Sequence, residues 1–251
     1  MTTASQPSLR RVHALLTAQT IIILLLSANR LGDWTLGYVA QNEFLRWVDL
    51  HNMLTLPLAS LVAYWLLTSH LPDLSTRPER RDAVTAAISL AIVVGVYLLG
   101  AGYGDPEITN YLHLRFAETQ GAGADAIGGA GRDALARIIV FNDDSFSHWV
   151  FFIGYSLMNG ALMLWQTAFP FRGRLARRDA GLIAANGLFI ALGIFANLAF
   201  EEIGLDLYVV AGLAALAGAL LWRHRNQPIL VYSAVAYIGG FAATALAKLV
   251  V

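Results

Sequence analysis

The residues of this chain with the clearest chemical potential are histidines and carboxylates at the ends of long apolar segments. They are Asp49, His51, Asp144, His148, Glu201 and Glu202. The first two begin the second apolar segment, the next two begin the fourth, and the glutamates end the fifth. Ionisable side chains are costly within a membrane, so a group of them at one depth indicates a functional site.

Imidazole and carboxylate groups together form a suitable ligand set for zinc or iron. We predict His51, His148 and Asp144 as ligands of such a metal, with His113 as a further imidazole from the loop before the fourth segment. Asp144 and His148 are four residues apart, so they share one face of a helix. An open position on the metal would activate water for hydrolysis.

The acidic residues are also predicted to act as general acids or bases. Glu201 is the favoured general acid or base, and Asp144 and Asp49 are further candidate catalytic carboxylates. A simpler interpretation is that the aspartates cap their helices, while His51 and His148 make interhelical hydrogen bonds near the membrane surface. Capping does not explain Glu201, because the dipole at a helix C-terminus disfavours an acid. The sequence contains no HExxH motif that would support a metal site independently.

The composition is that of an integral membrane protein. Hydrophobic residues make up 57% of the 251 residues and charged residues only 14%, with a mean hydropathy of +0.57. Soluble domains carry about 25% charged residues. The net charge is zero, so a nucleic-acid partner is not expected, and the lack of cysteine excludes disulfides and thiolate metal ligands.

The apolar residues fall into seven segments, and a membrane-spanning helix needs about 20 such residues. No alternation typical of strands competes with them. The predicted fold class is therefore all-α, a polytopic membrane protein that forms a single domain over residues 1–251. The predicted helices are residues 13–28, 47–68, 83–103, 147–169, 180–200, 207–222 and 229–250, of which the first and sixth are short for a span.

Arginines define the predicted orientation. They lie before the first segment and in every even-numbered loop, as Arg10, Arg11, Arg77, Arg80, Arg81, Arg172, Arg174, Arg177, Arg178, Arg223 and Arg225. In a seven-span chain all these positions are on one side, which the positive-inside rule makes cytoplasmic. We therefore predict a cytoplasmic N-terminus and an outer C-terminus, in a membrane such as the inner membrane of a bacterium.

The long outer loop between the third and fourth helices is predicted to contain two amphipathic helices, at residues 106–119 and 132–141. A glycine-rich stretch at 121–131 separates them. Such helices are typical of a lid or of a segment docked on the membrane surface. A solvated loop without a function is the alternative.

Three functions fit the sequence. The first is a membrane enzyme that hydrolyses a lipid-like or isoprenoid-like substrate with a bound divalent metal. The second is a metal-free enzyme in which Asp144, Glu201 and Asp49 are protonated carboxyls that drive isoprenoid cyclisation or isomerisation. The third is a small transporter or a subunit of a membrane complex. A polar stripe through Asn159 and Asn186 is predicted to line an internal cavity, which would serve any of the three.

Overall fold

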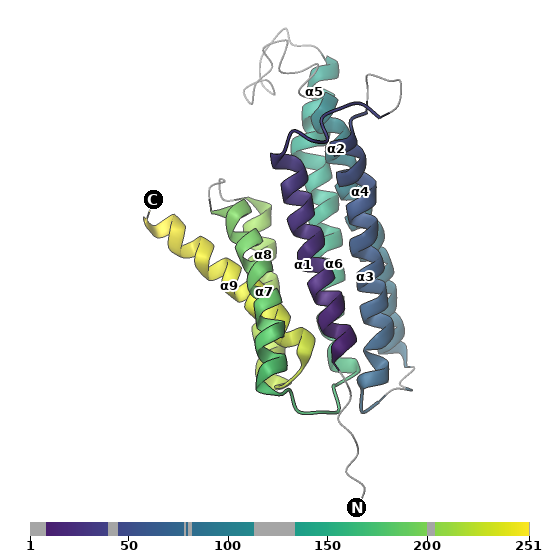
Figure 1. The fold of residues 1–251 in the computed structure, drawn as a ribbon, viewed down its shortest axis with the longest axis vertical. Coiled ribbons are helices and arrows are strands. Elements are labelled where there is room, and N and C mark those ends of the chain that lie inside the picture. Colours follow the sequence, from purple (N-terminus) through teal and green to yellow (C-terminus); the bar gives the residue numbers. More distant parts are fainter. Residues whose placement is uncertain are drawn as a thin grey trace, which may run out of the picture. The chain divides into compact units, whose positions relative to one another are not determined.

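The computed structural model of the protein describes residues 9–39, 45–77, 79, 82–112, 134–199 and 204–250. Every regular element within these ranges is a helix (Figure 1). Extended backbone pairs there only as two isolated bridges, Tyr38 with Arg46 and Ser75 with Phe171. The helices are α1 (Arg10–Leu31), α2 (Trp47–Leu50), η1 (His51–Thr55), α3 (Leu56–His70), η2 (Pro72–Leu74), α4 (Ala83–Leu112), α5 (Ala134–Phe141), η5 (Asn142–Phe146), α6 (Ser147–Ala168), α7 (Arg177–Leu198), α8 (Leu205–Arg223) and α9 (Pro228–Val250).

Five helical stretches of the described chain are long and apolar enough to cross a membrane. They are Trp47–Leu74, Ala83–Pro106, Arg177–Ala196, Leu205–Arg223 and Pro228–Leu249. The all-helical prediction is therefore confirmed for the described residues, and the five apolar helices fit an integral membrane protein. The helices α1 and α6 cover the other two predicted spans with 22 residues each, but neither is among the five.

Two predicted helix ends were wrong. The sequence predicted an end at residue 103 and a new helix at 106, whereas α4 runs without a break through Pro106 to Leu112. Proline removes one backbone donor but is tolerated in spanning helices where side chains satisfy the freed groups. The acceptor that Pro106 leaves free is the Gly102 carbonyl oxygen, four residues earlier. Separately, the Thr109 hydroxyl donates to the Asp105 carbonyl oxygen at 2.8 Å. Similarly, the predicted amphipathic helix at 132–141 is α5, and it continues through η5 directly into α6.

The chain divides into two compact units whose boundaries fall inside helices α1, α3, α4 and α6. Unit 1 comprises residues 1–23, 62–94 and 156–251, and unit 2 comprises residues 24–61 and 95–155. In unit 1, α9 packs along both α7 and α8 (Figure 1). A side chain at Gly187 would place its Cβ 2.7 Å from the Tyr232 carbonyl oxygen, so the α7 and α9 backbones approach closely there.

Glutamine side chains join the loops of unit 1. Gln166 donates to the Phe169 carbonyl oxygen at 2.9 Å and accepts from the Ile229 amide at 3.3 Å. Gln227 accepts from the Phe171 amide at 2.7 Å. These bonds satisfy buried backbone groups beside the start of α9, where spanning helices leave amides without partners.

In unit 2, glycines bring α4 and α6 into backbone contact. A Cβ at Gly102 would lie 2.3 Å from the Phe151 backbone nitrogen, and one at Gly154 would lie 2.3 Å from the Leu99 nitrogen. Small residues commonly permit such close packing in membranes, where the hydrophobic effect does not drive helices together. The turn η1 lies near α4 as well, because a Cβ added at Gly104 would lie 3.5 Å from Met53 Cγ.

Candidate functional site

Two turns of unit 2 are π-helical, and both carry residues that the sequence singled out. His51 begins the π turn η1, and Asp143 and Asp144 lie in the π turn η5. Helices α2 and α5 lead into these turns at the same end of unit 2 (Figure 1). π turns are rare and occur often at functional sites. We call this region the polar end of unit 2 and define it by Asn29, Thr35, Arg46, Asp49, His51, Asn52, Asp105, Thr109 and Asp143.

A carboxyl pair links α4 to η5. Asp105 and Thr109 follow Gly102 by three and seven residues, so they share the face of α4 that contacts α6. The Thr109 hydroxyl donates to Asp143 Oδ1 at 3.2 Å, in addition to its bond to the Asp105 backbone. Asp143 is 9% exposed, and its carboxylate and that of Asp105 repel each other. The Asp105 Oδ2 atom is fully buried and accepts no hydrogen bond from the described residues.

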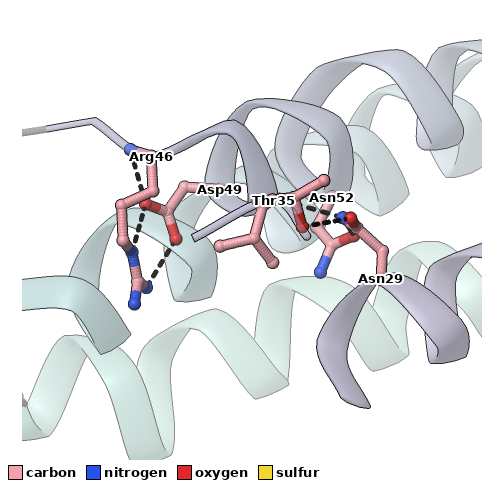
Figure 2. A network of polar contacts seen from close by, with 6 residues as sticks. Asn29, Thr35, Arg46, Asp49 and Asn52 are labelled. Atoms are coloured by element: carbon pink, nitrogen blue, oxygen red, sulfur yellow. Dashed lines mark hydrogen bonds and ion pairs between the residues drawn. The ribbon is translucent and has the colours of Figure 1, made fainter. Parts of the chain in front are cut away.

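An asparagine network joins the end of α1 to η1 (Figure 2). The Thr35 hydroxyl donates to Asn29 Oδ1 at 2.7 Å, and Asn29 Nδ2 donates to Asn52 Oδ1 at 2.7 Å and to the Val48 carbonyl oxygen at 3.3 Å. Asn52 is fully buried, yet its Nδ2 meets no acceptor among the described residues. Because a buried amide donor without a partner is costly, this atom is a candidate ligand contact.

Asp49 is held in an ion pair with Arg46 (Figure 2). The Arg46 guanidinium donates to both carboxylate oxygens, at 2.9 Å from Nε and 2.7 Å from Nη2, and the Arg46 amide donates at 2.9 Å. Asp49 is 3% exposed and closes the first turn of α2 in this way. This geometry favours the capping interpretation of Asp49 over a catalytic one, since its oxygens already have strong donors.

The other predicted site residues form no group of three or more potential metal ligands in the described part of the chain. His51 is half-buried, stacks on Trp47 and lies 3.4 Å from the Thr55 hydroxyl through Nδ1. Asp144 and His148 are exposed, and His148 meets Phe152 edge-on. No group of three or more histidines and acids close enough to hold a metal occurs within the described ranges. His113, Glu201 and Glu202 lie outside those ranges, so the metal site stays a prediction.

The predicted polar stripe of unit 1 includes one interhelical bond. Asn186 on α7 accepts from the Thr20 hydroxyl of α1 at 2.9 Å and donates to the Leu182 carbonyl oxygen at 3.0 Å. Near the start of the same two helices, His13 Nε2 lies 2.8 Å from Asp179 Oδ1. These pairs connect α1 to α7, which is an ordinary structural use of polar side chains in membranes.

Sequence reasoning missed Asp105, Thr109 and Asn52 as site residues. The spacing of Asp105 and Thr109 was a usable signal, because residues four apart share a helix face. A helix boundary at Pro106 hides this spacing, because it would put Asp105 and Thr109 in different segments. Asn52 lies beside His51 and gave no signal of its own, since its importance depends on what Asn29 and Thr35 contact.

Comparisons of the chain with protein-family models, with curated proteins and with solved structures find no match.

Proposed function

We propose that the chain crosses the membrane seven times, with a cytoplasmic N-terminus, and that the polar end of unit 2 faces outward. The seven predicted segments coincide with helices, and the arginine pattern supports the orientation. In this arrangement α1 and α6 are the two additional spans. Their buried polar residues, such as Gln19 and Asn159, are compatible with spanning because each is inside the protein.

We propose further that the protein is a membrane enzyme in which Asp105 and Asp143 perform acid–base chemistry on a lipid-like, isoprenoid-type substrate. The observation that carries this proposal is the carboxyl pair at the end of a candidate span, in which the buried Asp105 Oδ2 accepts no hydrogen bond from the described part of the chain. Two neighbouring carboxyls can act on one substrate as general acid and general base.

The proposed reaction is a proton-balanced isomerisation or cyclisation. The protonated member of the pair donates its proton to one carbon of a substrate double bond. The ionised member removes a proton from a neighbouring carbon, so substrate and product have the same composition. Thr109 is a positioning residue, because its hydroxyl orients Asp143 through the 3.2 Å bond.

Reconstitution tests the proposal. Purified protein in vesicles made from a bacterial total lipid extract supplemented with isoprenoid lipids should convert at least one species to an isomer, detected by chromatography and mass spectrometry. Asp105→Asn and Asp143→Asn should each slow conversion by about 100-fold or more, the usual contribution of a general acid or base. If no lipid species changes, the enzyme proposal is wrong.

Metal-dependent hydrolysis by the predicted ligands is the alternative, and the same vesicles distinguish it. That mechanism needs His51, His148 and Asp144, whereas the carboxyl pair does not. Loss of activity in His148→Ala and Asp144→Asn, together with about one zinc or iron per chain in the wild type, would support the metal site. Activity that persists in both variants and in metal-free protein would support the carboxyl pair.

A further inference from the structure

We infer that Asn52 and Asp105 together bind the hydroxyl group of a lipid-like alcohol. This inference rests on the proposed function in one respect only, because it identifies the ligand with the substrate. The binding site itself is argued from two buried polar atoms of unit 2 that have no partners among the described residues: Asn52 Nδ2, a donor, and Asp105 Oδ2, an acceptor.

The orientation of the Asn52 amide is determined by its neighbours. Asn29 must direct its Nδ2 toward the Val48 carbonyl oxygen, because the opposite assignment would place two oxygens together. Asn29 Oδ1 then receives the Thr35 hydroxyl, and Asn29 Nδ2 meets Asn52 Oδ1. The Asn52 NH₂ group is therefore directed away from Asn29, as Figure 2 shows.

The two unpartnered atoms belong to residues whose sequence neighbours, Met53 and Gly104, lie close to each other. Asn52 precedes Met53, Asp105 follows Gly104, and an added Cβ at Gly104 would lie 3.5 Å from Met53 Cγ. Asn52 is completely buried, so bulk solvent cannot satisfy its donor. A site with one donor and one carboxylate acceptor matches a group that both accepts and donates one hydrogen bond.

A hydroxyl group meets that requirement. Its oxygen accepts from Asn52 Nδ2 and its hydrogen is donated to Asp105 Oδ2. A ketone or an ether satisfies only Asn52, and a carboxylate or phosphate would be repelled by Asp105 and Asp143. The inferred ligand class is therefore a neutral lipid alcohol, and a prenyl alcohol fits the proposed chemistry.

Binding to protein in detergent micelles, measured by native mass spectrometry, tests the inference without requiring turnover. The probes are farnesol, its methyl ether, and the hydrocarbon farnesene, which has neither hydrogen-bonding group. We expect farnesol to bind about tenfold more tightly than the ether, and the ether more tightly than farnesene, because each lost hydrogen bond leaves a buried group unsatisfied. Equal affinity for all three would overturn the inference.

Variants assign the two bonds separately. Asn52→Leu should weaken binding of the alcohol and of the ether about tenfold, whereas Asp105→Leu should reduce the affinity for the alcohol to that for the ether. The control is Asn186→Leu, the same substitution at a buried asparagine of unit 1, which should leave all three affinities unchanged. A melting curve for each variant shows that it is folded, and Asn52→Ser provides a second, smaller change if Asn52→Leu does not fold.

The outcomes separate this inference from the proposed function. Selective binding of farnesol without conversion of any lipid would support the hydroxyl site and reject the enzyme. Conversion of lipids combined with unchanged binding in Asn52→Leu would support the enzyme and reject the hydroxyl site.

Discussion

At the scale of single residues, the polar end contains groups of two kinds. Asp49 and Arg46 satisfy each other almost completely, whereas Asn52 and Asp105 each keep one buried atom that has no partner among the residues that the structure describes. Satisfied groups stabilise the local fold, and unsatisfied ones cost free energy unless a ligand completes them. This difference, rather than residue type, separates the structural carboxylate from the candidate functional one.

The Arg46–Asp49 pair should contribute measurably to stability. Arg46→Ala leaves a buried carboxylate without its charged donor, and we expect a loss of about 2 kcal/mol, since charge-assisted hydrogen bonds contribute about 1.5–3 kcal/mol. Unfolding in mixed micelles with increasing SDS measures the change. Arg174→Ala is the control, because Arg174 is exposed. Equal effects of the two substitutions would show that the ion pair does not stabilise the protein.

At the scale of elements, the site depends on close packing and on π turns. Gly102 and Gly154 let α4 approach α6, and the approach brings the face with Asp105 and Thr109 toward Asp143 on η5. The extra residue of a π turn changes which side chains face inward, because each residue rotates the helix by about 100°.

Enlarging Gly102 should separate the two helices. Gly102→Ala places a methyl group 2.3 Å from backbone atoms of Phe151, so the backbones must move apart, at a cost of about 1–3 kcal/mol. Gly212→Ala is the matched control, because its added methyl group would meet no atom within 4 Å and alanine is the better helix former. Thermal melting in detergent compares the two, and equal or higher stability of Gly102→Ala would contradict the close packing.

Removing one residue from η5 tests the role of the π turn. Deletion of Ser145 should convert η5 to a regular α-helical turn and rotate Asp143 by about 100° relative to α6. We expect the helix content measured by circular dichroism to be retained, and lipid conversion to decrease as strongly as in Asp143→Asn. Conversion at the wild-type rate in the deletion variant would show that the π turn does not position the carboxyl pair.

At the scale of the whole molecule, the number and direction of the spans can be measured directly because the chain has no native cysteine. We expect single cysteines at Asp33 and Ile138 to react with a membrane-impermeant maleimide added to intact cells. Cysteines at Arg10 and Arg174 should be protected until the membrane is opened. Arg10 and Asp33 flank α1, so labelling of both cysteines from the same side would show that α1 does not cross the membrane. Ile138 and Arg174 flank α6, and labelling of both from the same side would show the same for α6.

The sequence by itself determined that the chain is helical, that its helices are apolar enough to fit a membrane, and roughly where each helix lies. Apolar segments of about 20 residues must satisfy their backbone groups within the segment, which makes helices the only solution for each segment taken alone. The candidate site was predicted only in part: His51 and Asp144 lie in the two π turns, but the carboxyl pair joins Asp143 to Asp105.

Only the tertiary structure decided the rest, because it depends on contacts between segments far apart in the chain. The continuation of α4 through Pro106 placed Thr109 beside Asp143, 34 residues away. Asn29, 23 residues earlier, bonds to the oxygen of the Asn52 amide, and the Asn52 nitrogen meets no acceptor within the described ranges. Hydropathy is a local sum and shows where helices lie, whereas hydrogen-bond satisfaction is a property of neighbours in space.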